Sequence, residues 1–343
     1  MSIFGVAFEP YVGPFVGNSP VLYNVYSLDQ VTQLLKTVGQ HFKLIATYGQ
    51  GTFVWQNQPN IQDANRLNIQ AAASVGLKVS AGCYQQGANS QTDSINEAWT
   101  QTEIDYAIAQ AKQYGNVVDL VIGNECLWGP NSTQAVIDLI NYAKSKRAPL
   151  RASDLPITTR QVWGVLAGVD NTSPSYAPMQ AKLKALLAAC ESHVYANMYA
   201  YFDDNIASAV GQNPTQTSFT QAVTPNMTSQ LSALKTAFSN QGVGLEVRIG
   251  ETGWPTKGSQ NAQPATYLTN PPQPEWYYQA MVNWAASNNV KTILFEAYDE
   301  PWKGKADGSD SEAYFGIWQA NGTAPDTGHY TLNGVTQKYT IGL

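Results

Sequence analysis

The stretch Val117-Val118-Asp119-Leu120-Val121-Ile122 is a short, mostly apolar run, and it ends in the polar triplet Gly123-Asn124-Glu125. A run that is apolar on both faces is typical of a parallel strand covered by helices. Similar runs occur along the whole chain, at residues 3–8, 43–48, 77–83, 157–162, 193–199, 245–249 and 292–297. The sequence therefore contains eight candidate strands.

Helical patterns separate several of these runs. In the segment 92–114, Ile104, Ile108 and Ala111 recur at the spacing of one helix face, and similar segments are 132–146, 176–191, 228–241 and 275–289. Strands alternating with helices, at a mean spacing of roughly 40 residues, favour an α/β fold of the single (β/α)8 TIM barrel type over a doubly wound sheet. No glycine-rich fingerprint follows the first run, which disfavours a dinucleotide-binding protein.

The loops complete this architecture. The turn-rich stretches 163–175, 203–227, 252–274 and 300–314 all follow predicted strands, on the barrel face where active sites are built. We therefore predict elaborated βα loops. No linker splits the chain, so we expect residues 1–343 to form a single catalytic domain, with the segment from about 310 to 343 packing on the barrel.

Composition narrows the class of ligand. Only 13% of the 343 residues are charged, against a usual share of about 25%, and the 53 Asn and Gln residues outnumber the 44 charged ones. The net charge of −6 offers nothing to attract nucleic acid or anionic lipid. Amides together with 9 Trp and 19 Tyr suit an uncharged, polyhydroxylated ligand, although a rigid aromatic core explains the aromatic residues equally well.

Metal, cofactor and membrane functions find no support in the sequence. The cysteines (Cys83, Cys126 and Cys190) and the three histidines show no metal-ligand spacing, so we expect no metal and no cofactor. No apolar run is long enough to span a membrane. The N-terminus lacks a leader-type segment, but four Asn-x-Ser/Thr sequons are compatible with secretion. We expect an extracellular or cell-wall protein whose leader has been removed.

Two glutamates stand out because each directly follows an apolar strand. Glu125 follows the fourth run, and Glu251 follows the seventh, in Val247-Arg248-Ile249-Gly250-Glu251. The carboxyl ends of barrel strands share one rim, so the two side chains are expected to face each other across the barrel mouth. Glycoside hydrolysis requires such a pair, one carboxyl protonated and one ionised. A lone strand-end Glu is more often a structural ion-pair partner, but two in these motifs favour catalysis.

These motifs resemble those of the family 17 glycoside hydrolases of clan A, which act on β-1,3-glucans. Gly123-Asn124-Glu125 is similar to the family's acid/base motif, and Gly250-Glu251-Thr252-Gly253-Trp254-Pro255 to its nucleophile motif. The segments 197–202 and 295–303 resemble its sixth- and eighth-strand segments, and the likeness is greater to fungal and bacterial cell-wall members than to plant enzymes. Ala46 departs from the family's usual Arg, and Ala200 from its usual Pro.

The resemblance implies a retaining, double-displacement mechanism and assigns roles in it. Glu251 is implied as the nucleophile and Glu125 as the general acid and base. Asn124 is implied to hydrogen-bond the sugar 2-hydroxyl, with a loop-capping role as the alternative. Tyr199 is implied to touch the nucleophile and keep it ionised, although a plain core Tyr is the alternative reading.

Further residues near the strand ends are candidates for substrate binding. The candidate sugar platforms are, in order, Trp254, Trp302, Tyr48 and Trp128, although any one of them can instead be a packing residue. Glu296, Glu300 and Lys303 are expected to form a polar network at the cleft edge, with a purely structural ion pair as the alternative. Glu9 and Tyr11 are weaker candidates, and we expect Cys126 to be a small buried filler.

The resemblance therefore implies an enzyme that acts on β-1,3-glucan or laminari-oligosaccharides, without a nucleic-acid partner, and we expect a monomer. We favour a β-1,3-glucanosyltransferase with hydrolytic side activity, because aromatic- and amide-rich loops suit an acceptor sugar. The alternatives with the same chemistry are an endo-β-1,3-glucanase and a relative that cleaves β-1,4 or β-1,6 linkages. A non-catalytic β-glucan-binding cell-wall protein is the alternative from another class.

Overall fold

A closed barrel of parallel strands, arranged in chain order, forms the centre of the protein. The computed structural model describes residues 3–13, 26–52, 63–87, 92–169, 176–259, 269, 272–304, 309–323 and 330–341. The barrel strands are β1 Ile3–Ala7, β2 Leu44–Ala46, β3 Lys78–Cys83, β4 Val117–Asn124, β5 Ile157–Val162, β6 His193–Asn197, β7 Glu246–Glu251 and β8 Thr292–Leu294. Every predicted strand run overlaps one of these strands, and the predicted TIM barrel is confirmed.

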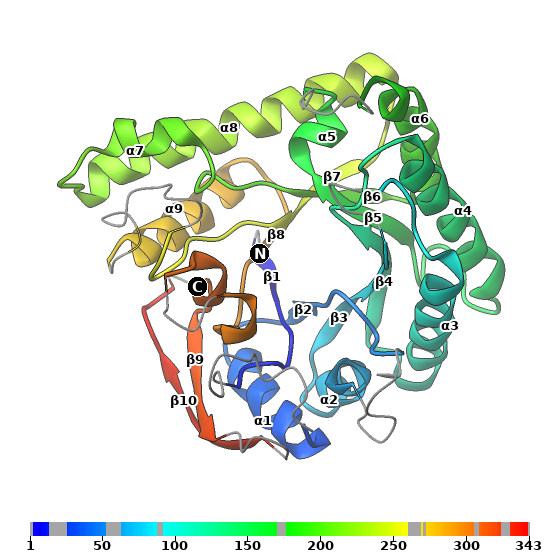
Figure 1. The fold of residues 1–343 in the computed structure, drawn as a ribbon, viewed down its shortest axis with the longest axis horizontal. Coiled ribbons are helices and arrows are strands. Elements are labelled where there is room, and N and C mark those ends of the chain that lie inside the picture. The colour runs from blue at the N-terminus through cyan, green and yellow to red at the C-terminus, as the bar shows by residue number, and fades with distance from the viewer. Residues whose placement is uncertain are drawn as a thin grey trace.

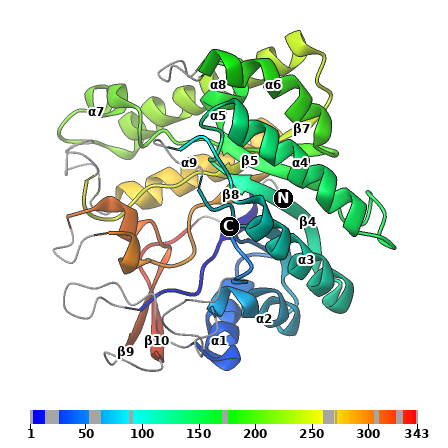
Figure 2. The same ribbon diagram turned by 45° about the vertical axis from the view of Figure 1, so that its right-hand side comes forward.

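Helices surround the barrel on its outside (Figures 1 and 2). They are α1 Leu28–Gly39, α2 Asn68–Ser74, α3 Glu97–Tyr114, α4 Pro130–Lys146, α5 Trp163–Ala167, α6 Tyr176–Ala189, α7 Asp204–Val210, α8 Gln216–Gln241 and α9 Gln273–Ser287. The predicted helices correspond to α3, α4, α6, α8 and α9, although α8 begins at Gln216 and not at residue 228. Within the described part of the chain, no helix combines the length and the apolar character needed to cross a membrane.

Helix α1, which the sequence analysis did not predict, carries clear local signals. The Ser27 side chain accepts a hydrogen bond from the backbone N–H of Gln30, and the Gln30 side chain accepts one from the backbone of Ser27. This reciprocal cap satisfies two N–H groups at the helix start. One face of the helix is buried against the barrel, through Val31, Leu34, Leu35 and Val38.

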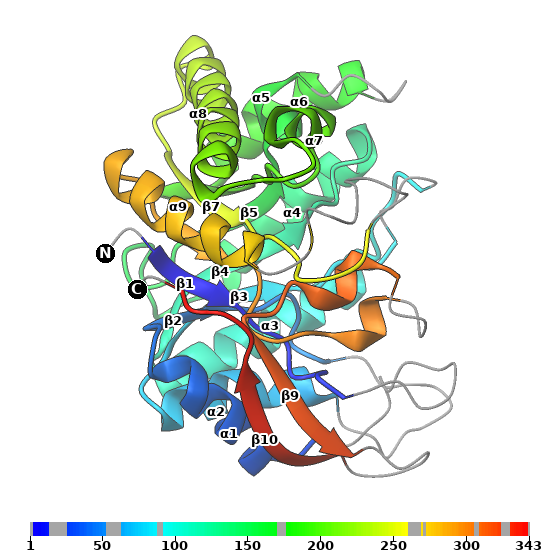
Figure 3. The same ribbon diagram turned by 90° about the vertical axis from the view of Figure 1, so that its left-hand side faces the viewer.

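A hairpin of β9 Trp318–Thr323 and β10 Thr331–Gln337 lies beside α1 (Figure 3). Trp318 is buried, and its ring centroid lies 5.9 Å from that of Tyr298. After the hairpin, the Lys338 ammonium donates hydrogen bonds to the Asp299 carboxylate, the Thr256 hydroxyl and the Tyr314 carbonyl. This last segment therefore ties together loops that follow β7 and β8.

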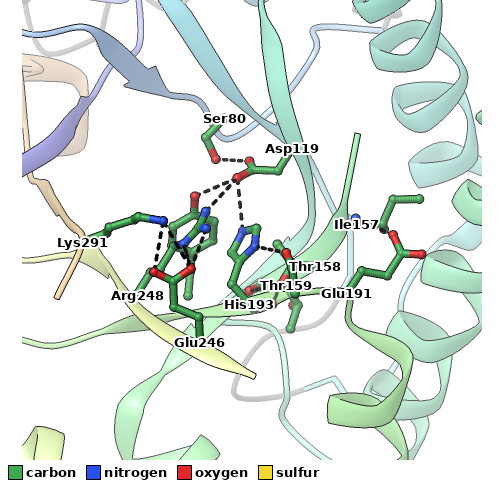
Figure 4. A network of polar contacts seen from close by, with 12 residues as sticks. Ser80, Asp119, Ile157, Thr158, Thr159, Glu191, His193, Glu246, Arg248 and Lys291 are labelled. Carbon is green, nitrogen blue, oxygen red and sulfur yellow. Dashed lines mark hydrogen bonds and ion pairs between the residues drawn. The ribbon is translucent and has the colours of Figure 1, made fainter. Parts of the chain in front are cut away.

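The amino-terminal end of the barrel is filled by a polar network centred on Asp119 of β4 (Figure 4). Ser80 and Tyr195 donate hydrogen bonds to its carboxylate, and His193 Nε2 lies 3.2 Å from Asp119 Oδ2. Burial opposes the charge, but contact with His193, Ser80 and Tyr195 outweighs it and lowers the pKa of Asp119. Arg248 adds a positive charge 3.7 Å away. The network holds this end of the barrel closed, and the strands carry Glu125 and Glu251 at the other end.

Candidate active site

A cavity of about 450 Å³ opens at the carboxyl ends of the strands. Both Glu125 and Glu251 line it, as the sequence predicted for side chains on a common rim. Half of its lining residues are aromatic, and the full set is Glu125, Val162, Trp163, Asn197, Tyr199, Phe202, Glu251, Phe295, Glu312 and Phe315. Two carboxyl groups thus share one cavity with rings on which a sugar can stack.

Glu125 follows the last residue of β4 in a left-handed backbone conformation, with φ = 49°. Its backbone N–H donates to the carbonyl of Arg160, and its carboxyl oxygen accepts a hydrogen bond of 2.7 Å from Asn197 Nδ2. The residue is open to the cavity, but surrounding protein displaces much of its water. This desolvation, together with the charge of Glu251, raises the pKa of Glu125 to about 7. A carboxyl in this range is suited to donate a proton near neutral pH.

Glu251 is the last residue of β7, and its side chain is almost fully buried. The Tyr199 hydroxyl donates a hydrogen bond of 2.9 Å to one carboxyl oxygen. Arg160 Nη1 lies 3.9 Å from the other oxygen. A hydroxyl donor on one oxygen and a cation near the other hold the carboxyl group in one orientation, which suits a nucleophile.

Asn197, the last residue of β6, lies between the two carboxyl groups. It is opposite Glu251 in the β6–β7 register, and its side-chain amide donates to Glu125. The same amide group lies 3.3 Å from Asn124 Oδ1. Asn197 therefore holds Asn124 and Glu125 in place, and the side chain of Asn124 remains at the cavity edge, half-buried.

Tyr48 lies behind Glu251, half-buried, with the Arg160 guanidinium 4.8 Å from its ring centroid. Burial and the charge of Glu251 raise the pKa of Tyr48 well above its usual range. The ring also meets Phe295 edge-on at 6.4 Å. Tyr48 thus belongs to the packed floor next to the cavity, and it is not among the residues that line it.

A second polar group lies beside Phe295. Lys303 Nζ lies 2.9 Å from Glu296 Oε2, pairs also with the Glu300 carboxylate, and stands over the Phe295 ring at 4.7 Å. Burial raises the pKa of Glu296. Burial alone would lower the pKa of Lys303, but the neighbouring carboxylates of Glu296 and Glu300 outweigh it and raise that pKa. Burial and Glu300 also raise the pKa of nearby Glu9 to about 8. These residues form the predicted polar network, and none of them lines the cavity.

The structure contradicts the prediction that Trp254 is the first-ranked sugar platform. The side chain is fully buried, and its ring centroid lies 4.8 Å from Phe219 and 5.2 Å from both Tyr201 and Tyr277. A ring enclosed by three others has no free face for a sugar, so Trp254 packs the loop after β7. Its neighbour Gly253 is required there because a Cβ would lie 2.1 Å from the carbonyl oxygen of Phe295.

The remaining predicted residues are not among those that line the cavity. Trp128 is 40% exposed, which leaves its ring available to a ligand, and Trp302 is half-buried beside Lys303. Tyr11 donates a hydrogen bond to Asp63 and is buried away from the cavity. Cys126 is buried and free, as expected for a filler. In the described residues no group of three or more His, Cys, Asp or Glu side chains is arranged to hold a metal ion.

Sequence reasoning missed several residues that meet in the cavity. Asn197 lies in a family-like segment without a motif of its own. Arg160 lies beside Glu251 outside the cavity lining, and the available signal was a charged residue in the middle of a predicted strand. Glu312 lies in a turn-rich stretch, where the sequence offers no signal. Other missed lining residues are Trp163, Phe202 and Phe315.

Comparisons with known proteins identify the family of the chain. The model of the BtgE/BtgC glycoside hydrolase domain matches residues 5–316. The chain is 24% identical over 294 residues to a glucan 1,3-β-glucosidase of Candida albicans, covering 82% of this chain and 80% of that protein. It is 25% identical over 281 residues to the acidic isoform of glucan endo-1,3-β-glucosidase of Zea mays, covering 75% and 77%.

Solved structures share the fold. An endo-laminarinase from Formosa Hel1_33_131 superposes with a TM-score of 0.71 at 18% identity, covering 92% of this chain and 83% of that one. A β-1,3-glucanosyltransferase from Rhizomucor miehei superposes with a TM-score of 0.60 at 16% identity, covering 92% of each chain. The chain therefore belongs to the BtgE/BtgC glycoside hydrolase family, and the predicted kinship with the family 17 glycoside hydrolases is confirmed.

Proposed function

We propose that the protein cleaves β-1,3-glucan with retention of anomeric configuration. The observation that carries the proposal is the presence of Glu125 and Glu251 in one cavity, in different environments: the pKa of Glu125 is raised to about 7, whereas Glu251 accepts a hydrogen bond from Tyr199 and lies near Arg160. A pair of carboxyls that differ in this way is the requirement for glycosidic bond cleavage. The substrate follows from the relatives, whose names describe action on 1,3-β-glucans.

In the proposed first step, a Glu251 carboxylate oxygen attacks the anomeric carbon and the glycosidic C–O bond breaks. Glu125 gives its proton to the departing oxygen, so the cleaved chain leaves as an alcohol. In the second step, Glu125 removes a proton from water or from a sugar hydroxyl, which attacks the same carbon and releases Glu251. Asn197 orients Glu125 through both steps, and Tyr199 orients Glu251.

The catalytic assignment is tested with Glu125→Gln and Glu251→Gln, assayed for reducing ends released from laminarin. Both variants are expected to lose at least a thousandfold in kcat, because each removes a group that takes part in bond exchange. Glu246→Gln is the matched control, since Glu246 is exposed at the opposite end of the same strand. Full activity of both active-site variants would instead support a non-catalytic glucan-binding protein.

We further propose that transfer to a second glucan predominates over hydrolysis. The cavity walls support this, because Trp163, Phe202 and Phe315 offer aromatic surface that binds an acceptor sugar and displaces water. Incubation with laminaripentaose, followed by mass spectrometry, is expected to yield products longer than the substrate. Shorter products alone would leave the endo-hydrolase as the function.

The proposal includes the setting in which the enzyme works. We propose that residues 1–343 act as one catalytic domain, as a monomer, outside the cell or in the cell wall. Light scattering of the purified protein measures the oligomeric state, and a mass near twice that of the chain would refute the monomer. A linkage panel of β-1,3-, β-1,4- and β-1,6-glucans tests the substrate, and faster cleavage of either of the other two would refute the β-1,3 assignment.

A further inference from the structure

Arg160, in the middle of β5, is a fully buried arginine with an unusual environment. None of its three guanidinium nitrogens forms a hydrogen bond within the described residues. A buried charge without hydrogen bonds is costly, and proteins normally satisfy it or replace it. The position of this guanidinium therefore calls for an explanation other than local stability.

The guanidinium of Arg160 lies next to the Glu251 carboxyl group, between two tyrosine rings. Its Nη1 atom lies 3.9 Å from Glu251 Oε1, and that oxygen has no hydrogen bond of its own. Tyr48 and Tyr195 cover the guanidinium, with ring centroids 4.8 Å and 5.8 Å from Cζ. Gly250 leaves room for the aliphatic stem, since a Cβ at that position would lie 2.8 Å from Arg160 Cγ.

Most of the other ionisable groups near Glu251 are acidic. Burial, and to a smaller extent the charge of Glu251, raise the pKa of Glu125 after β4, of Glu9 after β1 and of Glu312 after β8. Burial and the charge of Glu251 also raise the pKa of Tyr48 and Tyr199. Lys303, after β8, pairs with Glu296 and Glu300. Arg160 thus provides a positive charge directly beside Glu251, which otherwise faces several carboxyl groups.

We propose that Arg160 is a positioning residue that keeps Glu251 ionised and aimed at the anomeric carbon. This inference rests on the proposed function, because it gives Arg160 a role only if Glu251 is the nucleophile. The 3.9 Å separation leaves the Glu251 oxygen free of a fixed hydrogen bond, so the oxygen keeps its lone pairs for attack while the cation stabilises its charge. Tyr199 fixes the second oxygen.

The alternative is that Arg160 only packs between two tyrosine rings. A packing role predicts lower stability of a variant but leaves the pH dependence of the reaction unchanged. A positioning role predicts a shift of the acid limb of the kcat/KM profile, because a neutral residue no longer favours the carboxylate form of Glu251. The two roles are therefore separated by the pH profile.

The experiment compares Arg160→Met and Arg160→Gln, which remove the charge, with Arg160→Lys, which keeps it. With laminaripentaose as substrate, the neutral variants are expected to move the acid limb upward by about one pH unit or more and to lower kcat/KM at least about tenfold. The Lys variant is expected to return the acid limb toward that of the wild type. Arg248→Met is the matched control, a mostly buried arginine at the other end of the barrel (Figure 4).

A double-mutant cycle of Arg160→Met and Glu251→Gln gives a readout without activity. Each single change leaves one buried charge unpaired, so the double variant is expected to resist urea better than the sum of the two singles predicts. Additive effects, or folded neutral variants with the wild-type acid limb, would overturn the role of Arg160. An inactive wild type, or an active Glu251→Gln, would instead overturn the proposed function. The urea double-mutant cycle would still measure the interaction between Arg160 and Glu251 in that case.

Discussion

Replacement of Glu251 by Gln is expected to lower the pKa of Glu125. In the wild type that pKa is raised from 4.5 to about 7, first by desolvation and next by the charge of Glu251. The variant removes the second cause and leaves the first, so the pKa of Glu125 is expected to fall by about one unit and to stay above 4.5. The pKa of Glu125 must change in this direction, because removal of a neighbouring anion always favours ionisation of the remaining carboxyl.

The assay is a 13C NMR titration of protein labelled at the Glu side-chain carboxyl carbon, with the Glu125 signal assigned by its loss in Glu125→Gln. Glu246→Gln serves as the control and is expected to leave the Glu125 titration unchanged. The kcat/KM of the wild type is expected to fall with rising pH through about 7, to about a tenth of its plateau at pH 8, since the first step needs protonated Glu125. An identical Glu125 titration in the wild type and Glu251→Gln would refute the reasoning.

The same coupling bears on the proposed second step. When Glu251 becomes an ester in the glycosyl-enzyme, its negative charge disappears, as it does in Glu251→Gln. The pKa of Glu125 is then expected to fall at the stage when this residue must take up a proton. The geometry thus favours the change of Glu125 from acid to base without any movement of the chain.

Three further substitutions test other parts of the site. Tyr199→Phe removes the 2.9 Å hydrogen bond to Glu251, and we expect kcat to fall on the order of 10- to 100-fold with little change in melting temperature; an unchanged kcat would refute the role. Trp254→Ala is expected to cost about 3–5 kcal/mol of unfolding free energy in urea, and a raised KM at unchanged stability would restore the platform role. Lys303→Met leaves two buried carboxylates unpaired, at a cost of about 3–5 kcal/mol. Because the pKa of Glu296 is raised, the carboxyls take up protons as pH falls, and the loss of unfolding free energy in Lys303→Met is expected to shrink. An equal loss at pH 5 and pH 8 would contradict the ion pairing of Lys303 with Glu296 and Glu300.

Much of the fold could be predicted from the sequence because parallel barrel strands are buried on both faces and read as apolar runs. The start of α8 could not, since Pro225 inside the helix reads as a helix breaker. The helix nevertheless begins at a reciprocal cap formed by Thr215 and Ser218, and it continues through the proline. The prediction of α1 was within reach, given its cap and its apolar face.

The two central residues of the site were predictable because each follows its own strand in a distinctive motif. The supporting residues were not, because their roles depend on contacts between strands that are distant in sequence. Asn197 reaches Glu125 across 72 positions of the chain, and no local pattern marks that contact. Trp254 shows the opposite problem, since a tryptophan in a loop motif reads the same whether it stacks on a ligand or packs in the core.

The attachment of Lys338 to Asp299 has a consequence for how the protein matures in the cell. The ribosome delivers Lys338 only after every barrel strand and both glutamates of the cavity have been made. A nascent chain that already contains the whole barrel and the proposed site therefore still lacks the cation that pairs with Asp299, whose carboxylate is almost fully buried in the folded protein. We expect chaperones and proteases to treat chains cut before this lysine as unfinished, although their barrels are complete.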